Sequence, residues 1–359
     1  MPAKKDSLGE LIKLKNMKQL RSIEEVPENV NVILRMDTDL PFENETILDN
    51  SRLKKTIPTI RYLLEKNCRI VILGHRGRPE GKIVSELSLK PVYVDLMELL
   101  EDGQQTIESV FLDDIKDEQK ISSAFENNQI IFGENLRFWS EEDLGETSLF
   151  GVIKKYAKVF INDAFAVAHR KNASIILHRE IETYYGFSFV EEVEKISQIL
   201  ETRERPITIV LGGAKGDKLK YLAELAEMAD YVLVGGKLPK LITNYKLLIT
   251  NEKIKIARLR EDGLDLSEED IKIFSEIISS SKTIIWSGAM GLYEQENCRV
   301  GTQKIAQAVA NALGQKIIAG GDTSASIKDL GLKDKIDFVC SGGGVMLDWL
   351  VKGDLPAWN

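Results

Sequence analysis

The chain is poor in the residues that build disulfide scaffolds and metal centres. Its 359 residues include only three cysteines and three histidines, namely Cys68, Cys298, Cys340, His75, His169 and His178. Cysteines this few and this scattered exclude a disulfide framework and a structural zinc site, and they fit a reducing cytoplasm. The small number of histidines also argues against a histidine-rich catalytic metal centre.

Long apolar runs are missing as well. No run of roughly eighteen apolar residues occurs, which excludes a membrane-spanning helix, and the mean hydropathy is −0.15. The first twenty residues are charged throughout and lack the apolar segment of a secretory signal, so we expect a cytoplasmic location. A formal net charge of −8 argues against nucleic-acid and membrane partners, although it leaves room for a local cationic pocket.

Three well-known nucleotide motifs are also missing. The segment GGAKGDK lacks the GxxxxGK[ST] spacing of a P-loop, and no GxGxxG fingerprint follows the first strand-like run of either half. The H-R-D and D-F-G pair of protein kinases is missing too. An NAD-dependent dehydrogenase is therefore excluded, because both the fingerprint and a suitably spaced acidic partner for the ribose are lacking.

What the chain does contain is a series of short apolar runs rich in β-branched residues. Their lack of alternation predicts strands buried on both faces. They occupy residues 32–35, 69–74, 129–133, 158–162, 207–211, 231–234, 283–286, 316–319 and 337–340. Between them, helical spacing of apolar residues predicts helices at 53–64, 221–228 and 305–313.

This alternation of strands and helices predicts parallel sheets with right-handed crossovers, in one large sheet or two smaller ones. A charged amphipathic stretch near residues 189–205 predicts a connecting helix and a domain boundary. Pro58 lies inside the first helical pattern and predicts either a helix start near Thr56 or a kink.

The segments that follow the strands differ between the two halves. In the first half they are RMDTDLP, GHRGRP, GENLRF and NDAFAVAHR, and in the second LGGAKGDK, VGGK, WSGAMG, AGGDTSAS and CSGGG. Ligands of parallel sheets bind outside the carboxyl ends of the strands. The arginines and His75 of the first half therefore predict a site for a small polyanion. The glycines of the second half let backbone N–H groups approach phosphates and predict a nucleotide site.

Each of these motifs also has an ordinary structural interpretation. A single Gly-Gly pair is often only a tight turn, and a single arginine is more often part of a surface ion pair. The acidic run Glu141–Asp143 is interpreted as a solvated loop.

In these motifs the chain resembles the phosphoglycerate kinase family, from about Val32 to Pro356 and in collinear order. The runs GHRGRPEGK, ENLRF and NDAFAVAHR are the most specific. The resemblance implies an α/β fold of two Rossmann-like lobes, each a parallel β-sheet flanked by helices, separated by a cleft. It implies a 3-phosphoglycerate domain at 1–185, a nucleotide domain at 186–345 with an interdomain helix at about 189–203, and a segment 346–359 that returns toward the first domain.

The resemblance also implies an activity. A member of this family is a monomeric, hinge-bending phosphotransferase of glycolysis and gluconeogenesis. With Mg²⁺ it moves a phosphoryl group reversibly from 1,3-bisphosphoglycerate to ADP, giving 3-phosphoglycerate and ATP. Such a transfer needs no general base, because the accepting carboxylate is already ionised at neutral pH, and this suits a site rich in Arg, Lys and Gly.

The family's site residues fall on definite positions of this chain. The 3-phosphoglycerate residues are Asp37, Asp39, Arg52, His75, Arg78, Arg137 and Arg170. The nucleotide residues are Gly212, Gly213, Lys218, Gly235, Gly236, Glu294, Gly320, Gly321, Asp322 and Thr323. Asp322 resembles the carboxylate that meets Mg²⁺, and the catalytic positions are Arg52, Lys215, Gly321 and Gly344.

The chain departs from the family pattern in three places. Asp39 replaces the asparagine of DFNVP, and WSGAMG has Ser287 and Ala289 where the family has Asn and Pro. Lys215 and Lys218 are one residue closer than usual, which makes Lys220 a rival for the second position. These changes keep open a second hypothesis, a catalytically weak relative that only binds nucleotide or phosphoglycerate.

Overall fold

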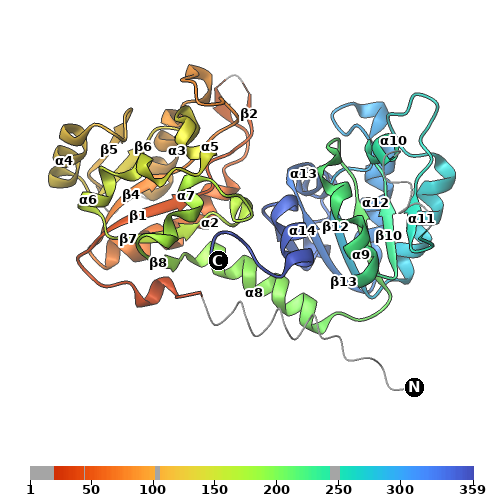
Figure 1. Ribbon diagram of the computed structural model, residues 1–359. Coiled ribbons are helices and arrows are strands. Elements are labelled where there is room, and N and C mark those ends of the chain that lie inside the picture. Colours follow the sequence, from red (N-terminus) through yellow and green to blue (C-terminus); the bar gives the residue numbers. More distant parts are fainter. Residues whose placement is uncertain (1–19, 44, 102–105, 243–250) are drawn as a thin grey trace. The chain divides into compact units, whose positions relative to one another are not determined.

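The computed structural model describes residues 20–43, 45–101, 106–242 and 251–359. These residues form two compact units (Figure 1). The first unit contains the described residues up to Val193 together with Asp354–Asn359, and the second contains Glu194–Gly353. Each unit is built on its own six-stranded sheet, and every strand pair within these two sheets is parallel. The predicted α/β class is confirmed, and the strands form two sheets rather than one.

The sheet of the first unit has the strand order β5-β6-β4-β1-β7-β8. Its strands are β1 (Asn31–Met36), β4 (Arg69–Leu73), β5 (Ser109–Leu112), β6 (Ile130–Gly133), β7 (Val159–Asp163) and β8 (Glu182–Tyr185). A two-stranded antiparallel sheet, β2 (Phe42–Glu43) with β3 (Thr46–Ile47), stands outside it. All six strands run in the same direction, so their carboxyl ends lie at the same end of the sheet.

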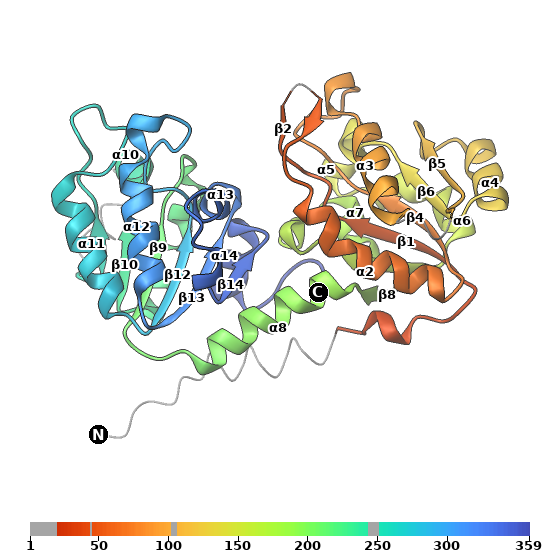
Figure 2. The ribbon, with the colours of Figure 1, turned by 180° about the vertical axis from the view of Figure 1, so that it is seen from behind.

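Helices cover both faces of this sheet, because successive side chains of a strand point to opposite faces. In β1, Val32 and Leu34 join one apolar core while Ile33 joins the other. The first core packs against α2 (Ser51–Glu65) and α3 (Lys90–Leu100), which lie in front of the sheet in Figure 2. The second core packs against α4 (Glu118–Asn127), α6 (Ile153–Tyr156) and α7 (Ala173–Ile176).

The sheet of the second unit has the strand order β11-β10-β9-β12-β13-β14. Its strands are β9 (Ile207–Leu211), β10 (Tyr231–Val234), β11 (Ile254–Ile256), β12 (Thr283–Ser287), β13 (Gln315–Ala319) and β14 (Phe338–Cys340). The chain proceeds outward from β9 in one direction and from β12 in the other. The order therefore reverses between β9 and β12, the kind of switch point at which doubly wound sheets bind ligands.

The helices of the second unit also lie on both sides of its sheet. An apolar core with Trp286 at its centre packs against α11 (Glu268–Ser280), α12 (Val300–Asn311) and α13 (Gly321–Asp329). The remaining elements include the 3₁₀ helix η7 (Gly216–Tyr221), α9 (Leu222–Met228), α10 (Leu238–Leu241) and α14 (Gly343–Lys352). In the part of the chain that the structure describes, no helix is both long and apolar enough to cross a membrane.

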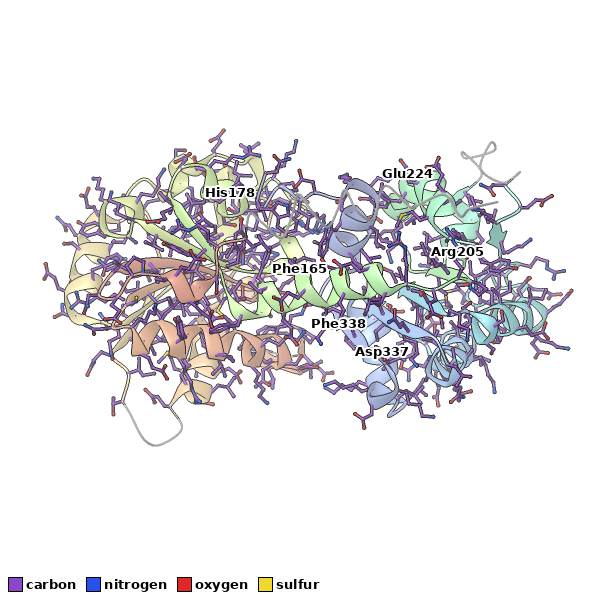
Figure 3. The ribbon with its side chains drawn as sticks, turned by 90° about the horizontal axis from the view of Figure 1, so that it is seen from below. Phe165, His178, Arg205, Glu224, Asp337 and Phe338 are labelled. Atoms are coloured by element: carbon purple, nitrogen blue, oxygen red, sulfur yellow. The ribbon has the colours of Figure 1, made fainter. Side chains whose placement is uncertain are left out.

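Helix α8 (Phe187–Thr202) begins in the first unit and ends in the second. At its start the backbone N–H of Phe189 donates to Asp163 Oδ1 over 2.8 Å. The Phe189 ring meets Phe165 edge-on, with 5.4 Å between ring centroids; Phe165 is labelled in Figure 3. Because Asp163 is buried, its pKa is raised to about 7.

The last residues of the chain pack against the first unit. The Ala357 N–H donates to the Ala168 carbonyl over 3.1 Å, and the Tyr185 hydroxyl donates to the Ala357 carbonyl over 2.9 Å. The Trp358 ring meets Phe189 edge-on, with centroids 5.9 Å apart. The tail therefore supports the segment that leads into Arg170.

All the predicted strands form, each within one or two residues of its predicted ends. The strands that the sequence missed in the two sheets, β5, β8 and β11, all lie at sheet edges. Edge strands are covered less completely, so they need no continuous apolar run. Pro58 lies within α2, which begins at Ser51 and not near Thr56.

One interpretation of the sequence is wrong. The run Glu141–Asp143 is not a solvated loop but lies in α5 (Ser140–Leu144). Glu142 is 1% exposed, because it turns inward and accepts hydrogen bonds from both the backbone N–H and the hydroxyl of Ser174.

Candidate functional site

Cationic side chains gather where the strands of the first sheet end. We call this set the cationic cluster: Arg35 in β1, Arg52 at the start of α2, His75 after β4, Arg137 in the 3₁₀ helix that follows β6, and Arg170 beyond β7. Carboxyl ends of parallel strands meet at one edge of a sheet, which brings these distant positions together. All four arginines lower the pKa of His75, so they lie within electrostatic reach of its ring.

Arg52 is held by two acidic residues from the segment after β1. Its Nη1 donates to Asp37 Oδ2 over 3.0 Å and to the backbone carbonyl of Asp39 over 3.0 Å. The Asp37 carboxylate raises the pKa of Arg52 above its ordinary value. Asp39 in turn accepts a 2.9 Å bond at Oδ1 from the Gly77 N–H. The Asp39 side chain thus supplies an acceptor for the loop after β4.

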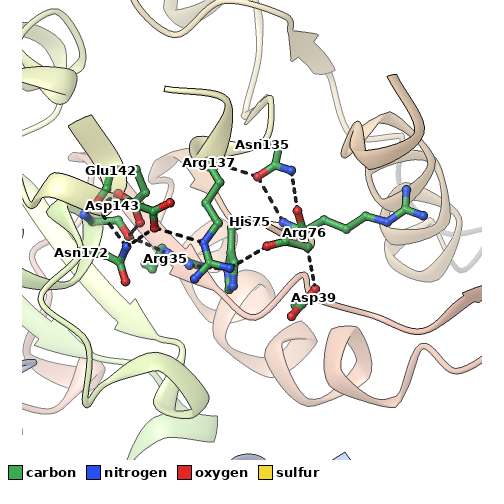
Figure 4. Close-up of polar contacts among 11 residues, drawn as sticks. Arg35, Asp39, His75, Arg76, Asn135, Arg137, Glu142, Asp143 and Asn172 are labelled. Atoms are coloured by element: carbon green, nitrogen blue, oxygen red, sulfur yellow. Dashed lines mark hydrogen bonds and ion pairs between the residues drawn. The ribbon is translucent and has the colours of Figure 1, made fainter. Parts of the chain in front are cut away.

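His75 has a defined protonation state. Arg35 Nη2 lies 2.8 Å from His75 Nδ1 (Figure 4). A guanidinium can only donate, so Nδ1 must accept and the ring proton must sit on Nε2. Burial, together with Arg35 and Arg137, lowers the pKa of His75 well below its ordinary value. His75 is therefore a neutral N–H donor at pH 7.

Arg137 and Arg170 bring positive charge that the chain only partly balances. Arg137 Nη1 donates to the Gly77 carbonyl over 2.6 Å, and its Nε lies 3.5 Å from Asp143 Oδ1. The buried Nε of Arg170 has no hydrogen-bond partner among the described residues. Burial, and then the nearby Arg137 and Arg78, lower the pKa of Arg170. Arg78 itself is exposed on the loop after β4. A buried donor without an acceptor is costly, so this cluster is built to take an anion.

In the second unit, three loops meet at the switch point. We call them the glycine loops: Gly212–Gly213 after β9, Gly235–Gly236 after β10 and Gly288 after β12. The Gly213 N–H donates to the Ala289 carbonyl over 2.7 Å and the Gly236 N–H to the Met290 carbonyl over 3.1 Å.

Glycine is required there because the loop backbones touch. A Cβ on Gly236 would lie 2.6 Å from the Gly213 nitrogen, and the φ of Gly236 is +62°. The N–H groups of Gly212, Gly213, Gly235 and Gly236 all bond to neighbouring loop or strand carbonyls. These four amides therefore hold the loops to one another. Amides at helix starts are better placed for a ligand, because the first N–H groups of a helix have no partner within the helix.

Of the three candidate lysines, only Lys218 is built into the glycine loops. Its Nζ donates to the Gly212 carbonyl over 3.2 Å, and to the carbonyl and hydroxyl of Ser287 over 2.9 and 3.1 Å. Burial lowers the pKa of Lys218 to about 8. Lys215 is exposed just before η7, and Lys220 Nζ lies 4.6 Å from the ring centroid of Tyr221. The structure thus places Lys218, rather than Lys220, beside the loops.

The starts of α13 and α14 carry the other candidates. Gly320, with a φ of +99°, precedes α13, and a Cβ on Gly321 would meet nothing within 4 Å. Asp322 is exposed in the first turn, and Thr323 Oγ1 accepts a 2.8 Å bond from the Gly288 N–H. Gly344 lies in the first turn of α14, and Glu294 lies on an exposed loop after β12. Helix starts with open space beside them suit phosphate groups.

No ready-made metal cage exists in the described ranges, where no three His, Cys, Asp or Glu side chains gather for a cation. Asp322 can offer a single hard carboxylate next to the start of α13. Mg²⁺ is commonly held in this way, by one or two carboxylates together with the phosphates of a nucleotide. The donor set fits Mg²⁺ carried on a nucleotide.

The model of one protein family, described as phosphoglycerate kinase, matches residues 23–248 and 244–353. The chain belongs to the phosphoglycerate kinase family. A phosphoglycerate kinase of Thermomicrobium roseum is 29% identical over 388 aligned positions, which cover 95% of this chain and 98% of that protein. One from Dictyoglomus turgidum is 31% identical, over 90% of this chain and 93% of the relative.

Solved structures agree with this assignment. The crystal structure of phosphoglycerate kinase from Pyrococcus horikoshii OT3 superposes with a TM-score of 0.78 at 26% identity, covering 94% of this chain and 97% of that one. The enzyme from Coxiella burnetii superposes with a TM-score of 0.72 at 27% identity, with the same coverage. The predicted family and the predicted two-sheet α/β fold are both confirmed.

The sequence does not predict a role at this site for Arg35, Glu142 or Ser174. Arg35 ends a predicted apolar strand, Glu142 lies in the acidic run interpreted as a solvated loop, and Ser174 belongs to none of the motifs. The signal for Arg35 was available, because a charged residue inside the run NVILRM must find buried partners. Glu142 and Ser174 carried no such signal, because only the fold brings them together.

Proposed function

We propose that this chain catalyses reversible, Mg²⁺-dependent transfer of a phosphoryl group from 1,3-bisphosphoglycerate to ADP, giving 3-phosphoglycerate and ATP. Membership of the phosphoglycerate kinase family supports the reaction. The observation that carries the proposal is the cationic cluster, and above all the buried Arg170 Nε, which lacks an acceptor among the described residues. A step of glycolysis and gluconeogenesis is the role that follows.

The first unit supplies the phosphoglycerate site in this proposal. Its residues are Asp37, Asp39, Arg52, His75, Arg78, Arg137 and Arg170. Phosphoglycerate carries a phosphate, a hydroxyl and a carboxylate, so it needs both cations and neutral donors. Arg137 and Arg170 provide guanidinium forks suited to a phosphate, and neutral His75 provides one N–H on Nε2.

The reacting groups need little help with protons. In the direction of ATP consumption, the attacking carboxylate of 3-phosphoglycerate is already ionised, so the catalyst must position it and neutralise charge. Arg52 remains charged at every working pH, because Asp37 raises its pKa further. We assign Arg52 and Lys215 to stabilising the charge of the phosphoryl group in transit, with Gly321 and Gly344 offering backbone N–H groups at helix starts.

The second unit supplies the nucleotide site. Its residues are Gly212, Gly213, Lys218, Gly235, Gly236, Glu294, Gly320, Gly321, Asp322 and Thr323. The open space beside Gly321 admits a phosphate at the start of α13. Asp322 would hold Mg²⁺, which when bound neutralises charge on the phosphates. The glycine loops shape the floor of this site, and Lys218 provides its buried cation.

We further propose a monomeric enzyme of the cytoplasm. Each unit has its own apolar core, so neither needs a second copy to be stable. Cys68 and Cys298 are buried thiols, as expected of a protein that works in a reducing compartment.

A coupled assay with ADP, Mg²⁺ and 1,3-bisphosphoglycerate tests the proposal. We expect turnover in the wild type. In the reverse reaction, with ATP and 3-phosphoglycerate, we expect Arg170→Ala to raise KM for 3-phosphoglycerate at least about tenfold, since it removes a charged hydrogen bond. Arg69→Ala is the matched control, because Arg69 is exposed at the opposite, amino end of β4.

The rival hypothesis is a relative that binds nucleotide or phosphoglycerate without catalysis, and it predicts a different experimental result. Calorimetry would then detect ADP and 3-phosphoglycerate binding without any turnover. Unaltered kinetics in Arg170→Ala would reject the cationic cluster as the substrate site.

A further inference from the structure

A buried chain of hydrogen bonds runs behind His75, from Glu142 through Ser174 to Arg35. We call these four residues the Glu142 relay. The Ser174 hydroxyl donates to Glu142 Oε1 over 2.6 Å, and the Ser174 N–H donates to Oε2 over 2.9 Å. Arg35 Nε donates to Ser174 Oγ over 3.0 Å. Arg35 Nη2 donates to His75 Nδ1 over 2.8 Å (Figure 4). None of the four is more than 3% exposed.

The direction of each bond is set by chemistry. A guanidinium has only donors, so the Ser174 hydroxyl oxygen must accept from Arg35 Nε, and its own proton is left to donate to Glu142 Oε1. Burial raises the pKa of Glu142 above its ordinary value, while Arg35 and the two Ser174 donors act to lower it. At the other end of Arg35, His75 Nδ1 must accept. Arg35, which is held by Ser174 and Glu142, therefore determines the tautomer of His75.

The rigid geometry of Arg35 connects the position of Ser174 to the position of the donor that faces His75. The guanidinium is planar and its donors form a rigid fork. Its Nη1 donates to the Met36 carbonyl and its Nε to Ser174. With two sides of the plane anchored, the third side, Nη2, has one direction left, and His75 lies in that direction.

Glu142 also balances the charge of Arg35. Burial lowers the pKa of Arg35, and among the groups that raise it Glu142 acts most strongly, ahead of Asp37 and Asp39. Asp37 already bonds Arg52 and Asp39 bonds the Gly77 N–H. Glu142 can therefore serve Arg35 without occupying a group of the anion site.

We propose that Glu142 and Ser174 are positioning residues: acting through Arg35, they hold His75 as the Nε2–H tautomer, which leaves that N–H as a donor to an oxygen of bound phosphoglycerate. The identity of the ligand rests on the proposed function, but the control of the His75 tautomer does not. Arg35 occupies His75 Nδ1, so Nε2 is the ring nitrogen left to donate to a ligand.

Nitrogen NMR of the free, ¹⁵N-histidine-labelled protein reads the tautomer directly. The chain has three histidines, so His75 can be assigned by the signal that His75→Gln removes. In the wild type we expect one protonated and one unprotonated imidazole nitrogen at pH 7. In Ser174→Ala, and in Glu142→Gln, we expect the two nitrogen shifts to move toward each other as both tautomers become populated.

Glu141→Gln is the matched control. Glu141 lies on the same short helix, but it faces outward and pairs with Lys116 at the surface. This variant makes the same change of charge and should leave the His75 signals where they are. Circular dichroism on all variants separates a local change from a loss of folding, and Ser174→Ala, which removes a single oxygen, is the milder of the two relay variants.

Kinetics give the second measurement. Loss of one well-aligned donor to the substrate should raise KM for 3-phosphoglycerate about tenfold in Ser174→Ala and Glu142→Gln, with kcat within about threefold of wild type. A folded Ser174→Ala and a folded Glu142→Gln that both keep the pure Nε2–H signature would overturn the relay. A wild type that shows this signature but has no kinase activity would instead reject the proposed function and leave the relay standing.

Discussion

Arg52 Nη1 and Asp37 Oδ2 are 3.0 Å apart, and their side chains are only 29% and 10% exposed. The ion pair holds a permanent cation at the edge of the first sheet where the other cationic side chains gather. Asp37 thus fixes Arg52 in place before any substrate binds. A charge that is positioned in advance costs little reorganisation when a reaction needs it.

The first prediction concerns Arg52 and Lys215, the two cations assigned to the phosphoryl group in transit. Their benefit should fall on the transition state more than on ground-state binding. We expect Arg52→Ala and Lys215→Ala each to lower kcat by roughly 10²–10³-fold with much smaller changes in KM. Lys54→Ala, an exposed change on the same helix as Arg52, should leave kcat intact. Turnover within about threefold of wild type in both folded variants would contradict the assignment.

The second prediction concerns Asp39, at a position where the resemblance to the family leads us to expect asparagine. Its Oδ1 accepts from the Gly77 N–H over 2.9 Å, and an amide oxygen can accept the same bond. We therefore expect Asp39→Asn to keep KM for 3-phosphoglycerate within about threefold, whereas Asp39→Ala should raise it about tenfold by leaving that N–H unpaired. If Asp39→Asn instead lowered KM by about two orders of magnitude, the carboxylate would be repelling the substrate.

The strands could be read from the sequence because burial on both faces leaves a plain trace. Val32, Ile33 and Leu34 face two different cores in turn, so all three must be apolar. Edge strands lack this constraint: in β5 only Leu112 is buried. The ends of the central strands could therefore be predicted from the sequence. These ends also mark the part of the sheet where the functional side chains gather.

The relay behind His75 could not be read in the same way. Glu142 and Ser174 are 32 residues apart in the chain and meet only after α5 and α7 have packed. In sequence, Glu142 stands between two other acidic residues, which is the usual appearance of a solvated surface. The glycine loops show the same limit. The sequence predicts that their backbone approaches a phosphate closely, but in the structure the backbone of Gly236 approaches that of Gly213.

The third prediction concerns the pH dependence of nucleotide binding. Burial lowers the pKa of Lys218 to about 8, so the free protein loses this charge as pH rises through that value. Bound phosphate favours the charged form. Above pH 8 binding must therefore take up a proton, and the dissociation constant for ADP should rise by up to about tenfold per pH unit. Titration calorimetry in two buffers of different ionisation enthalpy measures that uptake.

Two variants separate Lys218 from its neighbour. Lys218→Ala should bind ADP more weakly and lose the pH dependence, while Lys220→Ala, which changes a lysine stacked on Tyr221, should keep it. The same proton uptake in Lys218→Ala as in wild type would show that another group is responsible.

The fourth prediction concerns Asp163 at the start of α8. Its pKa is about 7 in the folded protein, against an ordinary value of 3.8, because the carboxyl is buried. Between these two values the folded state binds a proton that the unfolded state does not. The stability that Asp163 contributes is therefore complete at low pH and is lost as pH rises to about 7, at up to about 1.4 kcal/mol per pH unit.

Asp163→Asn removes this dependence, because an amide does not titrate while its Oδ1 can still accept from the Phe189 N–H. We expect the melting temperature of Asp163→Asn, relative to wild type, to climb between about pH 5 and about pH 7 and then to level off. Thermal unfolding followed by circular dichroism measures the difference. Asp113→Asn is the control, because Asp113 is an exposed carboxylate whose hydrogen bond from Lys120 lowers its pKa, so its replacement should bring no such climb. A melting-temperature difference between Asp163→Asn and wild type that stayed constant over this range would mean that Asp163 does not hold a proton in the folded protein at neutral pH.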